Sequence, residues 1–179
     1  MTPDDVMSFW FEELTPPQWW KKDAELDEQI RQRFGSLYQQ AVAGELFEWR
    51  QSPHGRLAEV IVLDQFSRNL FRDDARAFAA DGMALVLAQE AVASGDHQAL
   101  NAVERSFLYM PYMHSESARV HEVAVELFEA NGIDHNLDFE LRHKVIIDRF
   151  GRYPHRNAVV GRESTAEEVE FLTQPGSSF

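Results

Sequence analysis

Helix-breaking residues cut this sequence into segments of helical length, and within each segment the apolar side chains recur every three or four positions. Between residues 23 and 43, for example, Leu26, Ile30 and Phe34 follow this spacing. Almost no stretch alternates apolar and polar residues, which is the pattern of a half-buried strand. The sequence therefore predicts an all-α fold.

We expect about eight helices, each lying between a capping residue and a breaker. The first begins behind Thr2 with Pro3 at its first position, which is a common helix start. Thr165 and Glu168 have the spacing of a capping box and open the last helix. The predicted ranges are 3–14, 23–43, 56–66, 74–93, 100–110, 115–131, 137–150 and a short helix from 165.

Length and charge favour a single cytoplasmic domain over residues 1–179. A chain of this length with 44% hydrophobic residues can bury a substantial core, and no linker rich in Pro, Gly or Ser divides it. The formal charge of −13 repels nucleic acids and anionic membrane surfaces, so neither is an expected partner. The acidic N-terminal segment lacks the basic region of a signal peptide, and no apolar run is long enough to cross a membrane.

The absence of cysteine narrows the available chemistry. Disulfides, thiolate zinc sites, iron–sulfur clusters and cysteine nucleophiles are excluded. The sequence also lacks a G-x-S-x-G motif and a glycine-rich phosphate loop, the common signatures of hydrolases and nucleotide-binding proteins. We therefore expect no cofactor, and any reaction would use oxygen and nitrogen side-chain groups.

A short motif occurs twice, 84 residues apart. The residues of the first copy and their counterparts in the second are Leu57 with Leu141, Ile61 with Val145, and Asp64 with Asp148. A helix places all three residues of a copy on one stripe, because they are spaced four and three apart. We therefore expect Asp64 and Asp148 to point inward and the two copies to face each other across a groove. Glu116 begins a similar stripe and is the third expected inward acid.

Positive charge is concentrated near the second copy. Residues 142–162 carry six basic residues and one acid, a local charge of +5 in an acidic chain. The arginine side chain binds carboxylate or phosphate through two parallel hydrogen bonds. We therefore expect polar residues near both copies to form a ligand-binding cluster, with these members: Gln65, Arg68, Asn69, Arg72, Arg149, Arg152, His155, Arg156 and Asn157.

The sequence leaves three roles open for the inward acids. Asp64, Asp148 and Glu116 orient the arginines, or act as acid–base groups together with His114, or only form buried ion pairs. Each Asp of the motif has an arginine four residues further on, which supplies a local partner. Structural ion-pair networks of this kind resemble functional sites.

Two histidine patterns have the composition of metal sites. Glu140 and His143 form an E-x-x-H pair, but a di-iron centre needs a second such pair and two more glutamates, which the sequence lacks. We interpret this pair as a solvated helix face. His114, Glu116 and His121 offer ligands for one divalent metal ion, but their irregular spacing is weak evidence, so we expect no metal site.

Four tryptophans occur in the first third of the chain, at positions 10, 19, 20 and 49. Large aromatic side chains mostly fill protein interiors, so we expect these residues in the core. The alternative is that they line an aromatic groove.

Several ordered strings together resemble one known family. They are LDQFSRNLFR at 63–72, YMPYMHSE at 109–116, RFGRYPHRN at 149–157, GREST at 161–165 and FLTQPGSSF at 171–179. These strings resemble the bacterial proteins grouped as domain of unknown function family 924, over essentially the whole chain. The resemblance implies a single all-helical domain similar to the tetratricopeptide superhelix, without a recognisable 34-residue repeat, and no established activity.

Three functions are compatible with the sequence. The first is a protein that binds, or acts on, a small anion with a phosphate or carboxylate group. The second is an adaptor that binds an acidic peptide or a protein C-terminus, and the third is a purely structural ion-pair network. A closed cavity of roughly 300–1,000 Å³ lined by arginines favours the first, a long open groove the second, and complete internal pairing the third. The oligomeric state is left open.

Overall fold

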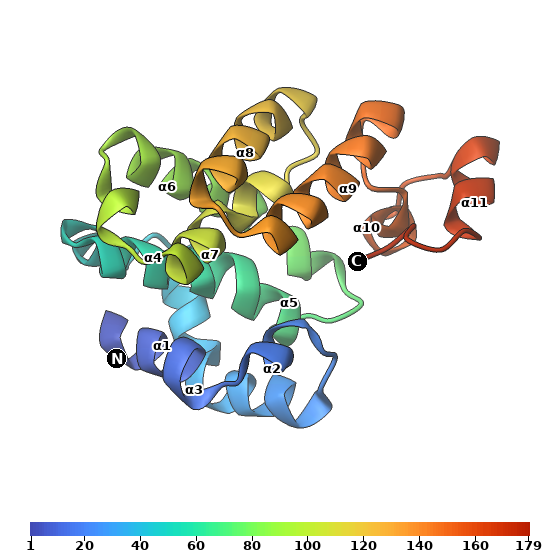
Figure 1. Cartoon of the computed structure of the whole chain (residues 1–179). Coiled ribbons are helices and arrows are strands. Elements are labelled where there is room, and N and C mark those ends of the chain that lie inside the picture. The colour runs from blue at the N-terminus through green and yellow to red at the C-terminus, as the bar shows by residue number, and fades with distance from the viewer.

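The protein is built from helices alone. The computed structural model describes residues 1–179 and contains eleven α-helical segments and no strand, as the sequence predicts (Figure 1). The more specific expectation of a tetratricopeptide-like superhelix stays a prediction. No helix combines the length and the apolar character that a membrane span requires.

The longer helices lie where the periodicity places them, and short helical turns join them. The helices are α1 Pro3–Ser8, α2 Pro16–Trp20, α3 Ala24–Val42, α4 Pro53–Ile61, α5 Ser67–Leu70, α6 Asp81–Ala93, α7 Ala102–Met113, α8 Ala118–Asn131, α9 Asp134–Phe150, α10 Asn157–Val160 and α11 Ala166–Leu172. The 3-10 turns are Phe47–Gln51, Ala75–Phe78, Asp96–Ala99 and Pro154–Arg156.

Capping residues fix several helix starts. The Thr2 side chain accepts a hydrogen bond from the Asp5 backbone and begins α1 at Pro3, as predicted. The Thr165 and Glu168 capping box is also present at the start of α11. Both starts were readable from the sequence because a capping box is a local pattern.

Three predicted boundaries are wrong. Residues 75–78 form a 3-10 turn capped by Asp74, so α6 begins only at Asp81. Pro111 does not end α7, because it lies in the last turn and costs the helix only one backbone hydrogen bond. The next helix starts after Ser117 rather than Ser115.

An aromatic cluster forms the centre of the main hydrophobic core. The rings of Phe9 and Phe66 flank that of Phe34, with both centroid distances at 4.8 Å, and Trp10 meets Phe107 edge-on at 5.6 Å. All five side chains are almost fully buried. This core has 33 residues between Val6 and Phe128, and a smaller cluster of Ile146, Ile147 and Tyr153 lies against the C-terminal turns.

One helix contains an irregular turn that matters for the site. Residues 53–70 form a continuous helix in which α4 and α5 are joined by the π-helical turn Val62–Phe66. A π turn holds one more residue than an α turn, and such turns occur often at functional sites. Every side chain of this turn is buried, including the carboxylate of Asp64.

Gly55 provides a test of the packing at the start of α4. A Cβ atom at this position would overlap the Trp49 carbonyl oxygen in the turn Phe47–Gln51. We expect Gly55→Ala to lower the free energy of unfolding by about 2 kcal/mol, because the backbone cannot move aside cheaply. Urea unfolding measures this change.

The matched control is Gly35→Ala, in α3. A Cβ atom there has no neighbour within 4 Å, so removing the helix-weakening glycine should raise the free energy of unfolding by about 0.5–1 kcal/mol. Equal effects of the two substitutions would contradict the close approach at Gly55.

Candidate functional site

A cavity of about 620 Å³ is the candidate site. Its wall is formed by the end of α2, the α5 helix, the end of α7, α9, the turn Pro154–Arg156 and the C-terminal end of the protein. The wall carries five basic side chains, Lys21, Lys22, Arg68, Arg72 and Arg156, and a single acid, Asp73. Four histidines also line it, His114, His135, His143 and His155. A protein with a net charge of −13 has therefore gathered basic side chains on the wall of one cavity.

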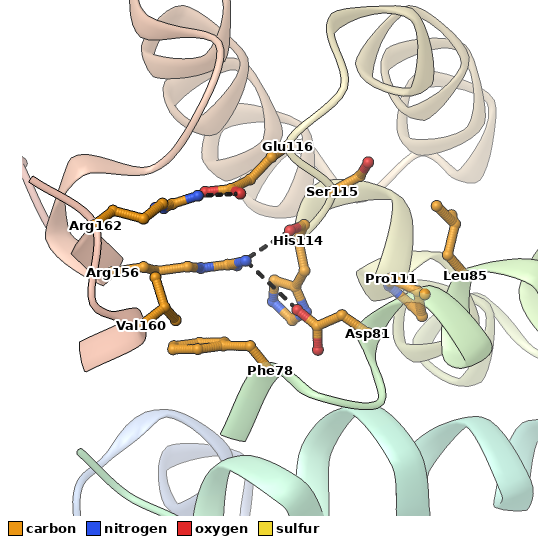
Figure 2. Close-up of a pocket in the computed structure, with 11 residues that line it drawn as sticks. Phe78, Asp81, Leu85, Pro111, His114, Ser115, Glu116, Arg156, Val160 and Arg162 are labelled. Carbon is orange, nitrogen blue, oxygen red and sulfur yellow. Dashed lines mark hydrogen bonds and ion pairs between the residues drawn. The ribbon is translucent and has the colours of Figure 1, made fainter. Parts of the chain in front are cut away.

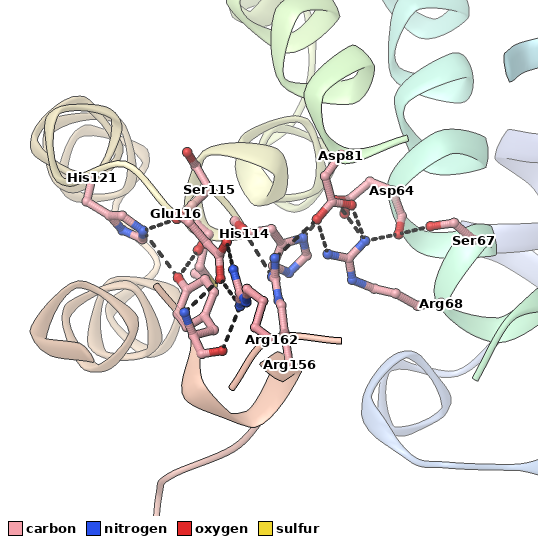
Figure 3. Close-up of polar contacts among 12 residues, drawn as sticks. Asp64, Ser67, Arg68, Asp81, His114, Ser115, Glu116, His121, Arg156 and Arg162 are labelled. Atoms are coloured by element: carbon pink, nitrogen blue, oxygen red, sulfur yellow. Dashed lines mark hydrogen bonds and ion pairs between the residues drawn. The ribbon is translucent and has the colours of Figure 1, made fainter. Parts of the chain in front are cut away.

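The carboxylate of Asp64 lies directly behind this wall. It receives hydrogen bonds from His114 Nδ1 at 2.7 Å and from Gln65 Nε2 at 2.6 Å, and Arg68 approaches it to 3.4 Å (Figure 3). Burial would raise the pKa of Asp64, but His114 and Arg68 outweigh it and hold this pKa at about 2. Burial and the charge of Arg68 lower the pKa of His114, so its imidazole is neutral at pH 7 and donates to Asp64.

Two guanidinium groups converge on one further carboxylate, that of Asp81 at the start of α6. Arg68 forms two hydrogen bonds to it, of 2.9 and 3.0 Å. Arg156 reaches the same carboxylate only at 3.5 Å, and its other bond goes to the His114 carbonyl oxygen at 3.1 Å (Figure 2). Asp81 is thus shared by two positive charges.

Arg156 is the least satisfied buried cation of the site. Its side chain is only 9% exposed and its Nε atom is buried without a hydrogen-bond partner. The guanidinium lies between the rings of Phe78 and Tyr153, at 4.4 and 4.6 Å from their centroids. Burial and the positive charge of Arg68 lower the pKa of Arg156. A buried guanidinium with incomplete pairing is suited to receive an anion.

Asp27 of α3 holds two polar residues, Asn69 of α5 and Arg72 of the turn that follows it. Arg72 donates to its carboxylate through Nε and Nη2, both at 2.6 Å, and Asn69 donates at 2.8 Å. These bonds hold the Arg72 guanidinium against the cavity, and its Nη1 atom forms no hydrogen bond. Lys21 and Lys22 form no ion pair at all.

A smaller cavity of about 280 Å³ lies on the other side of Arg156 (Figure 2). Glu116 lies on its wall and accepts hydrogen bonds from Arg162 at 2.7 and 2.8 Å and from the Tyr153 backbone at 2.8 Å. Partial burial would raise the pKa of Glu116, but these bonds outweigh it and lower this pKa. Glu116 is half-buried and precedes α8, so the predicted inward stripe at its start is wrong.

Asp148 does not match Asp64. Its side chain is 47% exposed and pairs with Lys144 one helical turn away. The motif spacing correctly puts Leu141, Val145 and Asp148 on one stripe of α9, but that stripe faces solvent. The buried face of α9 is the one with His143, Ile146 and Ile147, so the predicted groove between two equivalent aspartates is wrong.

Three of the nine predicted ligand-binding residues lie away from the cavity. Arg152 is held by both carboxylate oxygens of Glu168, at 2.7 and 2.8 Å, and Asn157 donates to the same carboxylate. Arg149 pairs with Glu167 on the surface. These residues fasten α11 to the preceding turns. The other six line the cavity, namely Gln65, Arg68, Asn69, Arg72, His155 and Arg156.

The metal candidates face different partners. His121 is fully buried and contacts Glu140 at 2.6 Å, the Ser115 carbonyl oxygen at 2.8 Å and the Tyr153 hydroxyl at 3.2 Å. His114 bonds to Asp64, and Glu116 bonds to Arg162. No group of three or more His, Asp or Glu side chains is arranged to hold a metal ion.

Glu140 and His143 are buried, so their interpretation as a solvated helix face is wrong. Burial raises the pKa of Glu140 and lowers that of His143 to about 3. His143 Nδ1 lies 2.7 Å from the Phe139 carbonyl oxygen and must donate to it, which leaves Nε2 with a free lone pair. Burial also lowers the pKa of His155 to about 4, and its Nδ1 atom is buried without a partner. Both rings are therefore neutral at pH 7.

The tryptophans divide between core and cavity. Trp10 lies in the core, as expected, and Trp49 packs against it. Trp19 and Trp20 line the cavity, where Trp19 Nε1 also donates to the Trp10 carbonyl oxygen at 2.8 Å.

Sequence reasoning missed Lys21, Lys22, His135, His143 and Phe179 as lining residues. One signal was available for the lysines, because two of the three lysines in the sequence are adjacent and directly follow Trp19 and Trp20. His143 and Phe179 gave no such signal, because only the packed fold brings them together.

Comparisons with known proteins give a fold relationship and no activity. The model of a family described as bacterial proteins of unknown function, DUF924, matches residues 6–176. A solved structure, that of the protein of unknown function ATU0120 from Agrobacterium tumefaciens, is 36% identical with a TM-score of 0.90. The match covers 95% of this protein and 96% of that one. No curated protein matches the sequence.

The two aspartates of the motif give a test of the network. We expect Asp64→Asn to lower the free energy of unfolding at pH 7 by about 3–5 kcal/mol, because it removes a buried carboxylate that attracts Arg68 and accepts hydrogen bonds from His114 and Gln65. The carboxylate of Asp64 has a lower pKa in the folded protein than the ordinary 3.8, so its contribution is present above pH 4 and is lost as the pH falls towards 2. The free energy of unfolding, measured in urea, should therefore change less with pH below pH 4 in this variant than in the wild type.

Asp148→Asn is the control, since the motif places the two residues in equivalent positions. An exposed pair of this kind contributes little, so the free energy of unfolding should change by less than about 0.5 kcal/mol. Similar losses in the two variants would show that Asp64 is not the buried centre of the network.

Proposed function

Because the chain belongs to the DUF924 family of bacterial proteins of unknown function, its ligand has to be argued from the site, and we propose that the 620 Å³ cavity binds a small molecule with a carboxylate or phosphate group. The observation that carries this proposal is the buried and incompletely paired Arg156 on a wall that also carries the unpaired Lys21 and Lys22, with Asp73 as its one acidic side chain. A low-dielectric concave wall strengthens the attraction between such charges and an anion.

Incomplete pairing supports the same ligand class. Lys21 and Lys22 form no ion pair, Arg72 keeps one free terminal nitrogen, and Arg156 shares Asp81 with Arg68. A purely structural network would pair each buried cation with its own carboxylate, as Arg152 is paired with Glu168. An anion in the cavity supplies a counter-charge for Arg156 and for the exposed Lys21 and Lys22, and it can bind the free terminal nitrogen of Arg72.

The acids behind the wall act as positioning residues in this proposal. Asp27 orients Arg72 and Asn69, and Asp81 orients Arg68. Asp64 holds His114 and Arg68 from the other side. Each guanidinium is thereby held in one orientation before the ligand arrives, which reduces the entropic cost of binding.

The size of the cavity favours a small molecule over an extended peptide. Sites for small ligands have volumes of about 300–1,000 Å³ and are lined by apolar and aromatic groups with a few polar ones. Trp19, Trp20, Phe78 and Phe139 supply the aromatic part of this wall. The adaptor function is accordingly the less supported alternative.

We expect anions to raise the melting temperature of the protein through Arg156. The probes are inorganic phosphate, pyrophosphate, succinate and citrate, with sodium chloride at matched ionic strength as the salt control. A ligand at a hundred times its dissociation constant stabilises by about 2.7 kcal/mol, which for a protein of this length is a shift of about 5–10 °C. Arg156→Met should lose at least tenfold in affinity while its own melting temperature changes little, because methionine replaces an imperfectly paired charge.

Arg152→Met is the matched control. It removes the ion pair with Glu168, so it should lower the melting temperature of the free protein and leave the anion-induced shift intact. The proposal fails if none of the four anions stabilises the wild type beyond chloride, or if Arg156→Met retains the full shift.

A further inference from the structure

The C-terminus of the protein lies in the cavity of the proposed function. Ser178 and Phe179 form part of its wall. The ring of Phe179 stacks on that of His143, with centroids 3.7 Å apart and planes inclined by 19°, and it meets the His155 ring edge-on at 6.2 Å. The cavity therefore contains a position for an aromatic ring, and the protein's own tail fills this position.

Few contacts hold the tail in place. The Ser177 hydroxyl donates to the Leu172 carbonyl oxygen at 3.2 Å, and no other side-chain hydrogen bond fastens residues 175–179. Phe179 remains 49% exposed despite its stack on His143. None of the side chains of residues 175–179 is acidic, although five basic side chains line the same cavity. The tail side chains thus fill the ring position and supply no anion to the basic wall.

His143 presents a rigid, neutral surface to whatever lies on it. Its Nδ1–H bond to the Phe139 carbonyl oxygen fixes the ring plane, and the Tyr153 ring meets it edge-on with centroids 5.7 Å apart. The same Tyr153 ring lies against the guanidinium of Arg156, 4.6 Å from the ring centroid. One tyrosine ring therefore contacts both the histidine of the stacking position and the least satisfied buried cation of the site.

We propose that the ligand of this cavity is an anion that carries an aromatic ring, and that its ring displaces Phe179 from His143. This inference rests on the proposed function and narrows its ligand class. A molecule with both groups can stack its ring on His143 and place its anion against the basic side chains, whereas Phe179 only stacks on His143. The tail is then a competitor that the ligand must remove.

The experiment compares Phe179→Ala with the wild type, using two pairs of probes that differ only in the ring. Phenyl phosphate is paired with methyl phosphate, and phenylacetate with acetate, with affinities measured by isothermal titration calorimetry. An aromatic stack contributes about 0.5–1.5 kcal/mol, so removing the competing ring should raise the affinity for the aromatic probe about two- to tenfold. The affinity for its partner without a ring should not change.

A second variant keeps the test independent of the tail. His143→Ala removes the stacking surface, so the preference for the aromatic probe over its partner should disappear in it. Thermal unfolding of both variants checks that they are folded. A protein truncated after Ser177 should bind each probe with the same affinity as Phe179→Ala.

The outcomes separate this inference from the proposed function. If the anions bind through Arg156 but a ring adds nothing, or if Phe179→Ala lowers the affinity for the aromatic probe, the inference is wrong and the proposed function stands. If no probe binds either protein, both are wrong.

The same chemistry could come from a free metabolite or from the C-terminus of another protein molecule. An acetylated Gly-Ser-Ser-Phe peptide, with a free or an amidated carboxyl group, distinguishes these sources on Phe179→Ala. Binding of the free acid at least tenfold tighter than phenylacetate assigns the site to a protein terminus. Weaker binding assigns it to a small aromatic anion.

Discussion

The buried carboxylate of Asp64 needs side chains as hydrogen-bond donors, because the backbone N–H groups around it are already used by helical bonds. His114 supplies one from the end of α7, and Arg68 approaches from the next helical turn. Arg68 in turn binds Asp81 at the start of α6, where Arg156 arrives from the C-terminal part of the protein. Four segments that are distant in sequence therefore meet through one buried negative charge, and the basic wall of the cavity lies where they meet (Figure 3).

The sequence predicted the first copy of the motif well and the second poorly, for a physical reason. Spacing states which residues share a stripe of a helix, but it does not state which stripe packs inward. In the helix of Asp64, the apolar stripe is also the buried one. In α9 two stripes compete, and the one with His143 and Ile146 packs inward, which leaves Asp148 in solvent. Packing against α8 decides between them, and that information is tertiary.

The arginine cluster is one group in the sequence and two groups in space. Arg156 belongs to the cavity, whereas Arg152 is only four residues away and fastens α11 through Glu168. The chain leaves α9 at Gly151 and enters the 3-10 turn Pro154–Arg156, so the two arginines do not share one helix face. Lys21 and Phe179 come from opposite ends of the sequence and reach the same cavity, so no local pattern could join them. Local features such as caps and periodicity were thus predictable, whereas of the three acids expected to point inward only Asp64 is buried, and the composition of the cavity was not predictable.

The π turn at Val62–Phe66 has a consequence for how this protein can change over evolution. Compared with a regular helix, the turn contains one inserted residue. If the same residues wound as a regular α-helix, the extra residue would rotate everything that follows by about 100°. Arg68, Asn69 and Arg72 would then leave Asp81 and Asp27, their partners on α6 and α3. A one-residue insertion or deletion in the regular part of this helix would misplace the same side chains, whereas the irregular turn can lose its extra residue without rotating them.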